Sequence, residues 1–293
     1  MSKISKKAYP MYLTLPALLI FGVFYEIPLI ASFILSFTDW NIKRLYEPVF
    51  LGIDNFVYIF SDDYFILAIQ NTFKFAIITT VSIIILGLLL ALALNTALKG
   101  KLFFRTIFYL PAVLSLIVVG IMFTSILKMN GGVLNNVLIA VGLESWTMDW
   151  LGNATTGLNS VIAMQIWKWS GFAMALFLAG LQSIPKDYLE AARIDGANAF
   201  HRFRYIVFPL LAPAFTIVVT TNTIGGFKVF EQVLVLTSGG PGNSTQVLST
   251  YIYKEFAKGT LGRSTAMSLV LFLMISVIAM SLNKYLKRRE ISL

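Results

Sequence analysis

The stretch TFKFAIITTVSIIILGLLLALALNTAL, residues 72–98, decides the class of this protein. Its only charged side chain is Lys74, and the run consists mostly of Ile, Leu, Ala and Thr. A helix needs about 20 apolar residues to cross a bilayer, and this run exceeds that length. Comparable runs elsewhere in the chain predict about six transmembrane helices in total. They lie near residues 11–37, 72–98, 103–127, 158–181, 206–236 and 264–286.

The composition of the whole chain agrees with a membrane class. Of the 293 residues, 57% are hydrophobic and only 13% are charged, whereas about 25% are charged in an ordinary soluble domain. The sequence therefore predicts an all-α integral membrane protein, with residues 1–293 forming a single transmembrane domain. The chain has no cysteine and a single histidine, His201, which excludes disulfides, thiolate chemistry and a histidine-rich metal site.

The basic side chains are divided unequally between the two sides of the predicted spans. The N-terminus, the 99–105 turn, the 182–205 loop and the C-terminal tail hold 14 lysines and arginines, whereas the opposite segments hold 6. Lysine and arginine collect on the cytoplasmic side, so we expect both termini and the 182–205 loop in the cytoplasm. The net charge of +9 then reflects topology and predicts no nucleic-acid partner. The 14 residues are Lys3, Lys6, Lys7, Lys99, Lys101, Arg105, Lys186, Arg193, Arg202, Arg204, Lys284, Lys287, Arg288 and Arg289.

The 182–205 loop is polar, yet it carries the signals of a helix. Pro185 suits a first helical turn, and the acidic residues that follow favour the positive end of a helix. Gly196 stands where such a helix would end. We therefore predict a helix of about three turns over 185–195 and a second short helix over 197–204. From these residues alone, an amphipathic anchor at the membrane surface fits the loop about as well as a docking element does.

The spacing within this loop resembles the signature of the membrane subunits of ABC importers. That signature is Glu-Ala-Ala, three residues, Gly, nine residues and Ile-x-Leu-Pro, and this chain departs from it only at Phe208, which replaces Leu. FLGIDNFVYIF (50–60), NTFKF (71–75) and FKVFEQVLVLTSGGPGNST (227–245) further resemble carbohydrate-uptake permeases of the maltose and glycerol-phosphate type. The residues that match the signature are Glu190, Ala191, Ala192, Gly196, Ile206 and Pro209.

The resemblance implies a transport subunit of an ATP-driven sugar importer in the cell membrane. The 182–205 loop, including Asp195, would be a coupling helix that docks on a separate ATPase, with Glu190 in a polar contact and Gly196 in the tight turn. The assembly would contain a second permease subunit, forming a heterodimer, together with two ATPase subunits and an external solute-binding protein. ATP and Mg²⁺ would bind to the ATPase, and the sequence contains no G-x-x-x-x-G-K-[ST] phosphate loop. We therefore expect no catalytic residue, cofactor or metal in this chain.

Polar residues within the fifth run, 206–236, are candidates for substrate contact. Asn222, Phe227 and Glu231 offer an amide, a ring and a carboxylate, which are groups that recognise sugars. The paired glycines at 225 and 226 favour local unwinding, as occurs near transporter sites. Packing between helices through small residues explains the same pattern about equally well. The full set of candidates is Gln165, Asn222, Gly226, Phe227, Lys228 and Glu231.

Lys74 and Lys168 lie within the predicted apolar runs. We expect Lys74 to extend to the outer membrane surface. Lys168, between Trp167 and Trp169, fits either a lysine of an outer aromatic belt or a binding site.

A permease for a non-sugar solute remains an alternative. A membrane-embedded enzyme would need paired aspartates or histidines within the runs, whereas the sequence has a single histidine, His201, and no aspartate inside the apolar cores. A channel would not need the 182–205 loop.

Overall fold

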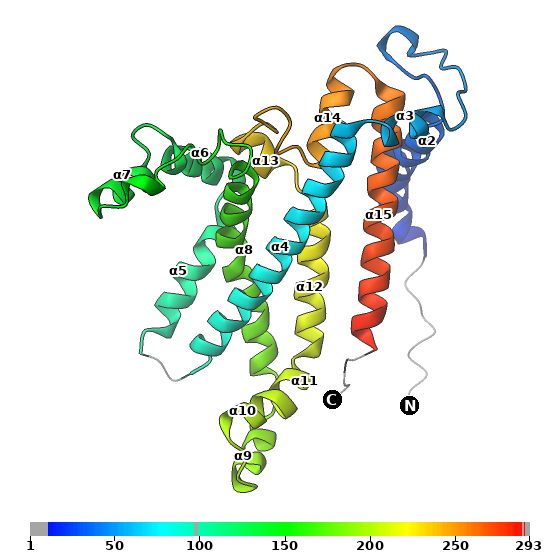
Figure 1. The fold of residues 1–293 in the computed structure, drawn as a ribbon. Coiled ribbons are helices and arrows are strands. Elements are labelled where there is room, and N and C mark those ends of the chain that lie inside the picture. The colour runs from blue at the N-terminus through cyan, green and yellow to red at the C-terminus, as the bar shows by residue number, and fades with distance from the viewer. Residues whose placement is uncertain (1–10, 97–98, 289, 291–293) are drawn as a thin grey trace. The chain divides into compact units, whose positions relative to one another are not determined.

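The computed structural model describes residues 11–96, 99–288 and 290, and every regular element in that part of the chain is a helix (Figure 1). Four helices are long and apolar enough to cross a membrane, and two bent pairs bring the number to as many as six. This confirms the predicted all-α membrane fold. The four helices are Leu15–Leu35 (α1, Leu15–Phe21, a π-turn, and α2, Ile27–Leu35), α4 (Asp63–Leu94), α8 (Gly157–Gln182) and α15 (Leu261–Lys287).

The two bent pairs interrupt runs for which the sequence predicts one continuous helix each. In the 103–127 run, α5 (Lys101–Val113) and α6 (Leu116–Leu127) meet at 98°. In the 206–236 run, α12 (Ala212–Phe227) meets the helical segment Ala199–Leu210 at 66° and ends well before residue 236. A proline lies in or beside each bend, where its missing N–H and its ring disfavour a continuous helix. Pro111 stands in the last turn of α5, and α12 has a proline in its first turn.

The remaining helices are short. Before α4 lie a 3₁₀ turn at Met11–Thr14, another at Ile42–Arg44, and α3 (Asp54–Phe60). Those after α6 are α7 (Val133–Ala140), a 3₁₀ turn at Glu144–Trp146, α9 (Lys186–Ile194), α10 (Ala199–Arg202), a π-turn at Phe203–Val207, α11 (Phe208–Leu210), α13 (Glu231–Leu236) and α14 (Leu248–Ala257).

The predicted second span starts earlier than expected, at Asp63, because an acidic residue in the first turn favours a helix N-terminus. Residues 97–98, Lys3, Lys6, Lys7 and Arg289 of the predictions lie outside the described residues.

The chain forms two compact units, and the smaller contains the described residues up to Asp62 together with Ile252–Leu271. Its buried Asn55 donates from Nδ2 to the backbone oxygens of Ser36, at 2.9 Å, and Thr38, at 2.7 Å. The backbone N–H of Gly262 donates to the oxygen of Trp40 at 2.6 Å. These bonds provide donors for the backbone carbonyls of residues 36, 38 and 40, which lie outside the helices. Backbone polar groups that are buried on folding need such partners.

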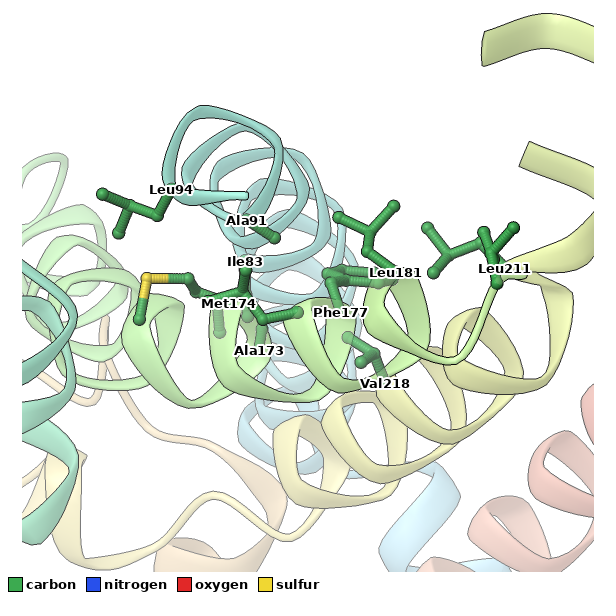
Figure 2. Packing of buried hydrophobic residues seen from close by; sticks show 11 residues of the cluster. Ile83, Ala91, Leu94, Ala173, Met174, Phe177, Leu181, Leu211 and Val218 are labelled. Atoms are coloured by element: carbon green, nitrogen blue, oxygen red, sulfur yellow. The ribbon is translucent and has the colours of Figure 1, made fainter. Parts of the chain in front are cut away.

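The larger unit contains Asp63–Tyr251 and residues from Phe272 onward, and its centre is a packed group of α4, α8 and α12. Phe177 and Met174 of α8 are fully buried against Ile83 of α4 and Val218 of α12 (Figure 2). Lipid tails are as apolar as these side chains, so close packing and not water exclusion holds such helices together. Gly87 permits that packing, since a Cβ atom there would lie 3.1 Å from the backbone of Met174.

Candidate functional site

The first candidate site is the helical loop between α8 and α12, which we call the projecting loop (residues 185–207). Within the larger unit, α9 and α10 lie beyond one end of α8 and α12, whereas α6, α7 and α13 lie toward the other end (Figure 1). Helix α9 spans Lys186–Ile194, with Pro185 at its N-cap and Asp187 in its first turn. This confirms the helix predicted from the sequence.

Gly196 ends α9 in the manner that the sequence predicts. Its φ of +79° lies in the left-handed region that favours glycine. The backbone N–H of Ala197 donates to the oxygen of Ala192 at 2.9 Å, and that of Gly196 donates to the oxygen of Arg193 at 3.1 Å. This pair of bonds is the Schellman motif, which satisfies carbonyls that the end of a helix leaves without partners.

The second helix of the projecting loop, α10, is shorter than the predicted helix over 197–204 and is followed by a π-turn. Asn198 caps α10, because its Oδ1 accepts from the backbone N–H of His201 at 2.9 Å. The guanidinium of Arg202 donates to the oxygen of Ala197 at 2.6 Å. The helix α10 ends at Arg202, and the chain then passes through the π-turn Phe203–Val207 into α11, which contains Pro209.

The surface of the projecting loop combines charge with exposed apolar side chains. Ile194 is 86% exposed and Phe200 is 70% exposed. A hollow of about 420 Å³ is lined by residues that include Asp195, Gly196 and Ile206. Glu190 and Ala191 are exposed, whereas Ala192 is buried against its own chain. Exposed apolar side chains on so polar an element are typical of a surface that contacts either a protein partner or the membrane surface.

The second candidate site is a cavity of about 430 Å³ beside α8. Helix α12 ends at Phe227, and residues 228–230 are not helical before α13 begins at Glu231. This break brings the predicted residues Lys228 and Glu231 to the same cavity, where both side chains are exposed. The full lining is Ala112, Leu114, Leu116, Lys168, Trp169, Lys228, Phe230, Glu231 and Gln232.

Gln165 does not line this cavity, but it forms a hydrogen bond with a side chain that does. It is 7% exposed, and its Oε1 accepts from Nε2 of Gln232 at 3.0 Å. Gln232 itself lines the cavity. No pattern in the neighbouring residues singles out Gln232, because its position in the lining depends on the break that starts α13 beside α8.

The other predicted substrate residues lie on the part of α12 that packs within the helix bundle. Nδ2 of Asn222 donates to the oxygen of Val218 in its own helix at 2.8 Å. A Cβ atom at Gly226 would lie 2.8 Å from Cα of Ala76, and Phe227 is 4% exposed. The helix continues through both glycines, so the expected unwinding at 225–226 does not occur. It fails because Gly226 serves as a close-contact point with α4, and the chain leaves the helix only after Phe227.

Two lysine expectations have different outcomes. Lys74 is exposed on α4, which is compatible with its expected extension to the membrane surface. Lys168 is 3% exposed, so the aromatic-belt alternative is wrong. Its Nζ donates to backbone oxygens at the break between α5 and α6, at 2.6 Å from that of Leu114. Trp169 lies beside it in the cavity lining, and its indole Nε1 is buried without a hydrogen-bond partner among the described residues.

Comparisons with known proteins place this arrangement in a family. Residues 83–292 match the family model "Binding-protein-dependent transport system inner membrane component". The chain is 35% identical over 279 residues to AmyD of Thermoanaerobacterium thermosulfurigenes, a probable starch degradation products transport permease, covering 95% of this chain and 94% of AmyD. It is 36% identical over 282 residues to the arabinooligosaccharides transport permease AraP of Bacillus subtilis (strain 168), covering 94% and 88%.

Solved structures agree with the sequence relatives. A chain of a bacterial ABC transporter that imports the acidic polysaccharide alginate superposes with a TM-score of 0.83 at 28% identity, covering 94% of each chain. A bacterial alginate ABC transporter in complex with an alginate pentasaccharide-bound periplasmic protein gives a TM-score of 0.79 at 25% identity, covering 97% of this chain and 96% of that chain. The present chain is therefore a multi-pass membrane protein that belongs to the family of binding-protein-dependent transport system inner membrane components.

Proposed function

We propose that this chain is the membrane-spanning permease subunit of an ATP-driven carbohydrate importer, in which it forms half of the translocation pathway. The observation that carries the proposal is the projecting loop, a polar element with exposed apolar side chains on an otherwise apolar helix bundle. The names of AmyD and AraP, and the alginate transporter, support a saccharide as the substrate. A non-sugar solute is the alternative within the same family.

The projecting loop is the element that docks on a separate ATPase. Its exposed Glu190 offers a carboxylate, Ile194 and Phe200 offer apolar contacts, and the Schellman turn at Gly196 fixes the angle between α9 and α10. ATP and Mg²⁺ bind to that partner, and this chain contributes no catalytic group. Movement of the ATPase is transmitted through α9 to α8 and α12, because the loop directly joins those two helices.

The proposed assembly has several partners. It contains a second permease subunit, two copies of the ATPase and an external solute-binding protein. The alginate transporter in complex with a periplasmic binding protein supports the last of these. Residues 1–293 act as one permease domain in the cell membrane, with both termini and the projecting loop in the cytoplasm, as the distribution of lysine and arginine indicates.

Part of the substrate site is the cavity beside α8. Glu231 and Gln232 provide a carboxylate and an amide for sugar hydroxyl groups, and Lys228 provides an ammonium group. Trp169 adds an aromatic surface to the lining. Polar groups beside an aromatic surface are what a saccharide requires. Gln165 acts indirectly, by holding Gln232.

The test of this function is reconstitution of the complete transporter. The chain is expressed with candidate permease and ATPase partners, and ATP hydrolysis is measured with and without sugar-loaded binding protein. We expect an intact assembly whose hydrolysis is stimulated by one class of sugar. A chain that inserts stably but never retains an ATPase would show that the projecting loop is only an anchor.

The cavity is tested separately by Glu231→Gln. This variant removes the charge at nearly constant size, and we expect it to raise the sugar concentration that half-saturates uptake. Glu144→Gln is the matched control, because Glu144 is an exposed carboxylate outside the cavity lining. Equal half-saturating concentrations for both variants would remove Glu231 from the site.

A further inference from the structure

Lys168 is a cation buried within a membrane-spanning helix. It is 3% exposed, and among the described residues no carboxylate forms an ion pair with it. Charged groups are costly within a membrane and are normally paired or bound to backbone carbonyls. The function proposed above does not use this charge, so its position calls for a physical explanation.

The broken end of α5 supplies the partners of Lys168. Nζ donates to the backbone oxygens of Leu114 at 2.6 Å, Pro111 at 3.0 Å and Ala112 at 3.4 Å. The last carbonyls of a helix have no partner within the helix and carry its negative end, which favours a cation. An ammonium group has three N–H donors, so these contacts use all of them. Lys168 is thus occupied by the helix end and has no donor left for a solute.

The same break sets the directions of two helices. Leu114 and Ser115 are in extended conformations, and α5 and α6 meet there at 98°. On the α5 side, Gly171 lies one turn from Lys168 on α8, and a Cβ atom there would lie 3.0 Å from Cα of Tyr109. On the α6 side, a Cβ atom at Gly120 would lie 3.2 Å from Cβ of Val235 in α13. The bend therefore places α5 tightly against α8 and α6 tightly against α13.

This bend also forms part of the cavity. Ala112, Leu114 and Leu116 line it together with Lys168, and Glu231 at the start of α13 lines it as well. We propose that Lys168 is a positioning residue for transport, whose ammonium group caps the broken end of α5, holds the bend between α5 and α6, and so fixes the shape of the cavity. This inference rests on the proposed function for its consequence in transport, but not for its consequence in structure.

The structural consequence is tested by a distance across the bend. The chain has no cysteine, so Leu102→Cys on α5 and Ser125→Cys on α6 provide two labelling positions, both exposed. The helical rise and the bend of 98° place these backbone positions about 22 Å apart, against about 34 Å in one straight helix. Spin-label distances are measured in the assembled transporter, with the partner subunits made cysteine-free.

Three substitutions at Lys168 are compared with a matched control. Lys168→Met keeps the length of the side chain but removes all donors, so we expect a longer and broader distance distribution. Lys168→Arg keeps charged N–H donors and is expected to retain most of the short distance. Lys168→Gln is one atom shorter and has only two donors for the three carbonyls, so we expect an intermediate distance distribution, and an unchanged one would also overturn the proposal. Lys74→Met is the control, because Lys74 is an exposed lysine in a membrane span and outside the cavity lining. An unchanged distance in Lys168→Met would overturn the proposal.

The transport consequence is read from the concentration dependence of sugar uptake. Lys168→Met leaves three carbonyls without their donor, and the loss of a partner by even one buried hydrogen-bonding group changes a conformational equilibrium by about tenfold. We therefore expect Lys168→Met to lower the maximal rate by at least roughly tenfold. Lys168→Arg should recover part of it. If Lys168→Met does not fold, Lys168→Gln carries both readouts. A raised half-saturating concentration with an unchanged distance would make Lys168 a substrate contact and overturn the proposal. Failure of the unsubstituted transporter to import any sugar would refute the proposed function, while the distance measurement would still decide the role of Lys168.

Discussion

Substitution of Gly196 separates backbone strain in the projecting loop from contact with a partner. Gly196 has a φ of +79°, and no heavy atom lies within 4 Å of the position that a Cβ atom would occupy. A larger side chain therefore meets no obstacle within this chain. The cost of the substitution comes from the left-handed conformation alone, which is about 1–2 kcal/mol for an L-residue with a Cβ atom.

The conformational cost should differ among the three variants Gly196→Val, Gly196→Ala and Gly196→Asn. Valine is β-branched and suffers most, alanine suffers less, and asparagine adopts the left-handed region most readily of the three. A strain of 1–2 kcal/mol changes the population of the correctly formed turn by a factor of about 5–30. We therefore expect the amount of sugar imported per ATP hydrolysed to fall about tenfold in Gly196→Val and least in Gly196→Asn.

The assay measures uptake and ATP hydrolysis in proteoliposomes that contain the full assembly. Gly100→Val is the matched control, since Gly100 has a φ of +78° and an equally open Cβ position but lies in the turn before α5. Wild-type coupling in Gly196→Val would refute the reasoning about the turn. Equal losses in Gly196→Asn and Gly196→Val would refute strain as the cause and indicate that the ATPase surface lies against Gly196.

Three further predictions concern packing and hydrogen bonds in the larger unit. Gly226→Ala should lower the thermal unfolding midpoint in detergent, because its methyl group would overlap the backbone of α4, whereas Gly225→Ala has open space and should leave the midpoint equal or raise it. Asn71→Ala should destabilise the loop before α14 by about 1–3 kcal/mol, because Nδ2 of Asn71 donates to two of its backbone carbonyls at 2.8 and 2.9 Å, and limited proteolysis should show faster cleavage there. Gln165→Leu and Gln232→Leu should have non-additive effects on the half-saturating sugar concentration, with a coupling of about 0.5–1.5 kcal/mol in a double-mutant cycle.

Each of these three has a result that contradicts it. Equal midpoints for the two glycine variants would mean that α4 and α12 are not in close contact. Unaltered cleavage in Asn71→Ala would mean that the loop is held by other bonds. Strict additivity of the two glutamine variants would place Gln165 outside the substrate site.

The features that the sequence alone determined are local ones. The apolar run that contains α4 identifies a membrane helix, because the bilayer requires a fixed length of apolar residues. The helix α9 and its end at Gly196 follow from the capping preferences of a few neighbouring residues. Both predictions depend only on residues that are close together in the chain, so neither needed a tertiary contact.

The breaks in the helices and the composition of the cavity were decided only by the tertiary structure. Lys168 and Pro111 are 57 residues apart in sequence, and nothing near Lys168 shows that its ammonium group would cap the end of α5. Likewise, Gly226 favours unwinding when its own helix is considered alone, but its contact with Ala76 makes it a packing residue. A buried polar group takes whichever partner the fold brings to it, and a glycine permits close approach as readily as a bend. For these residues the neighbouring helices, and not the local sequence, determine the role.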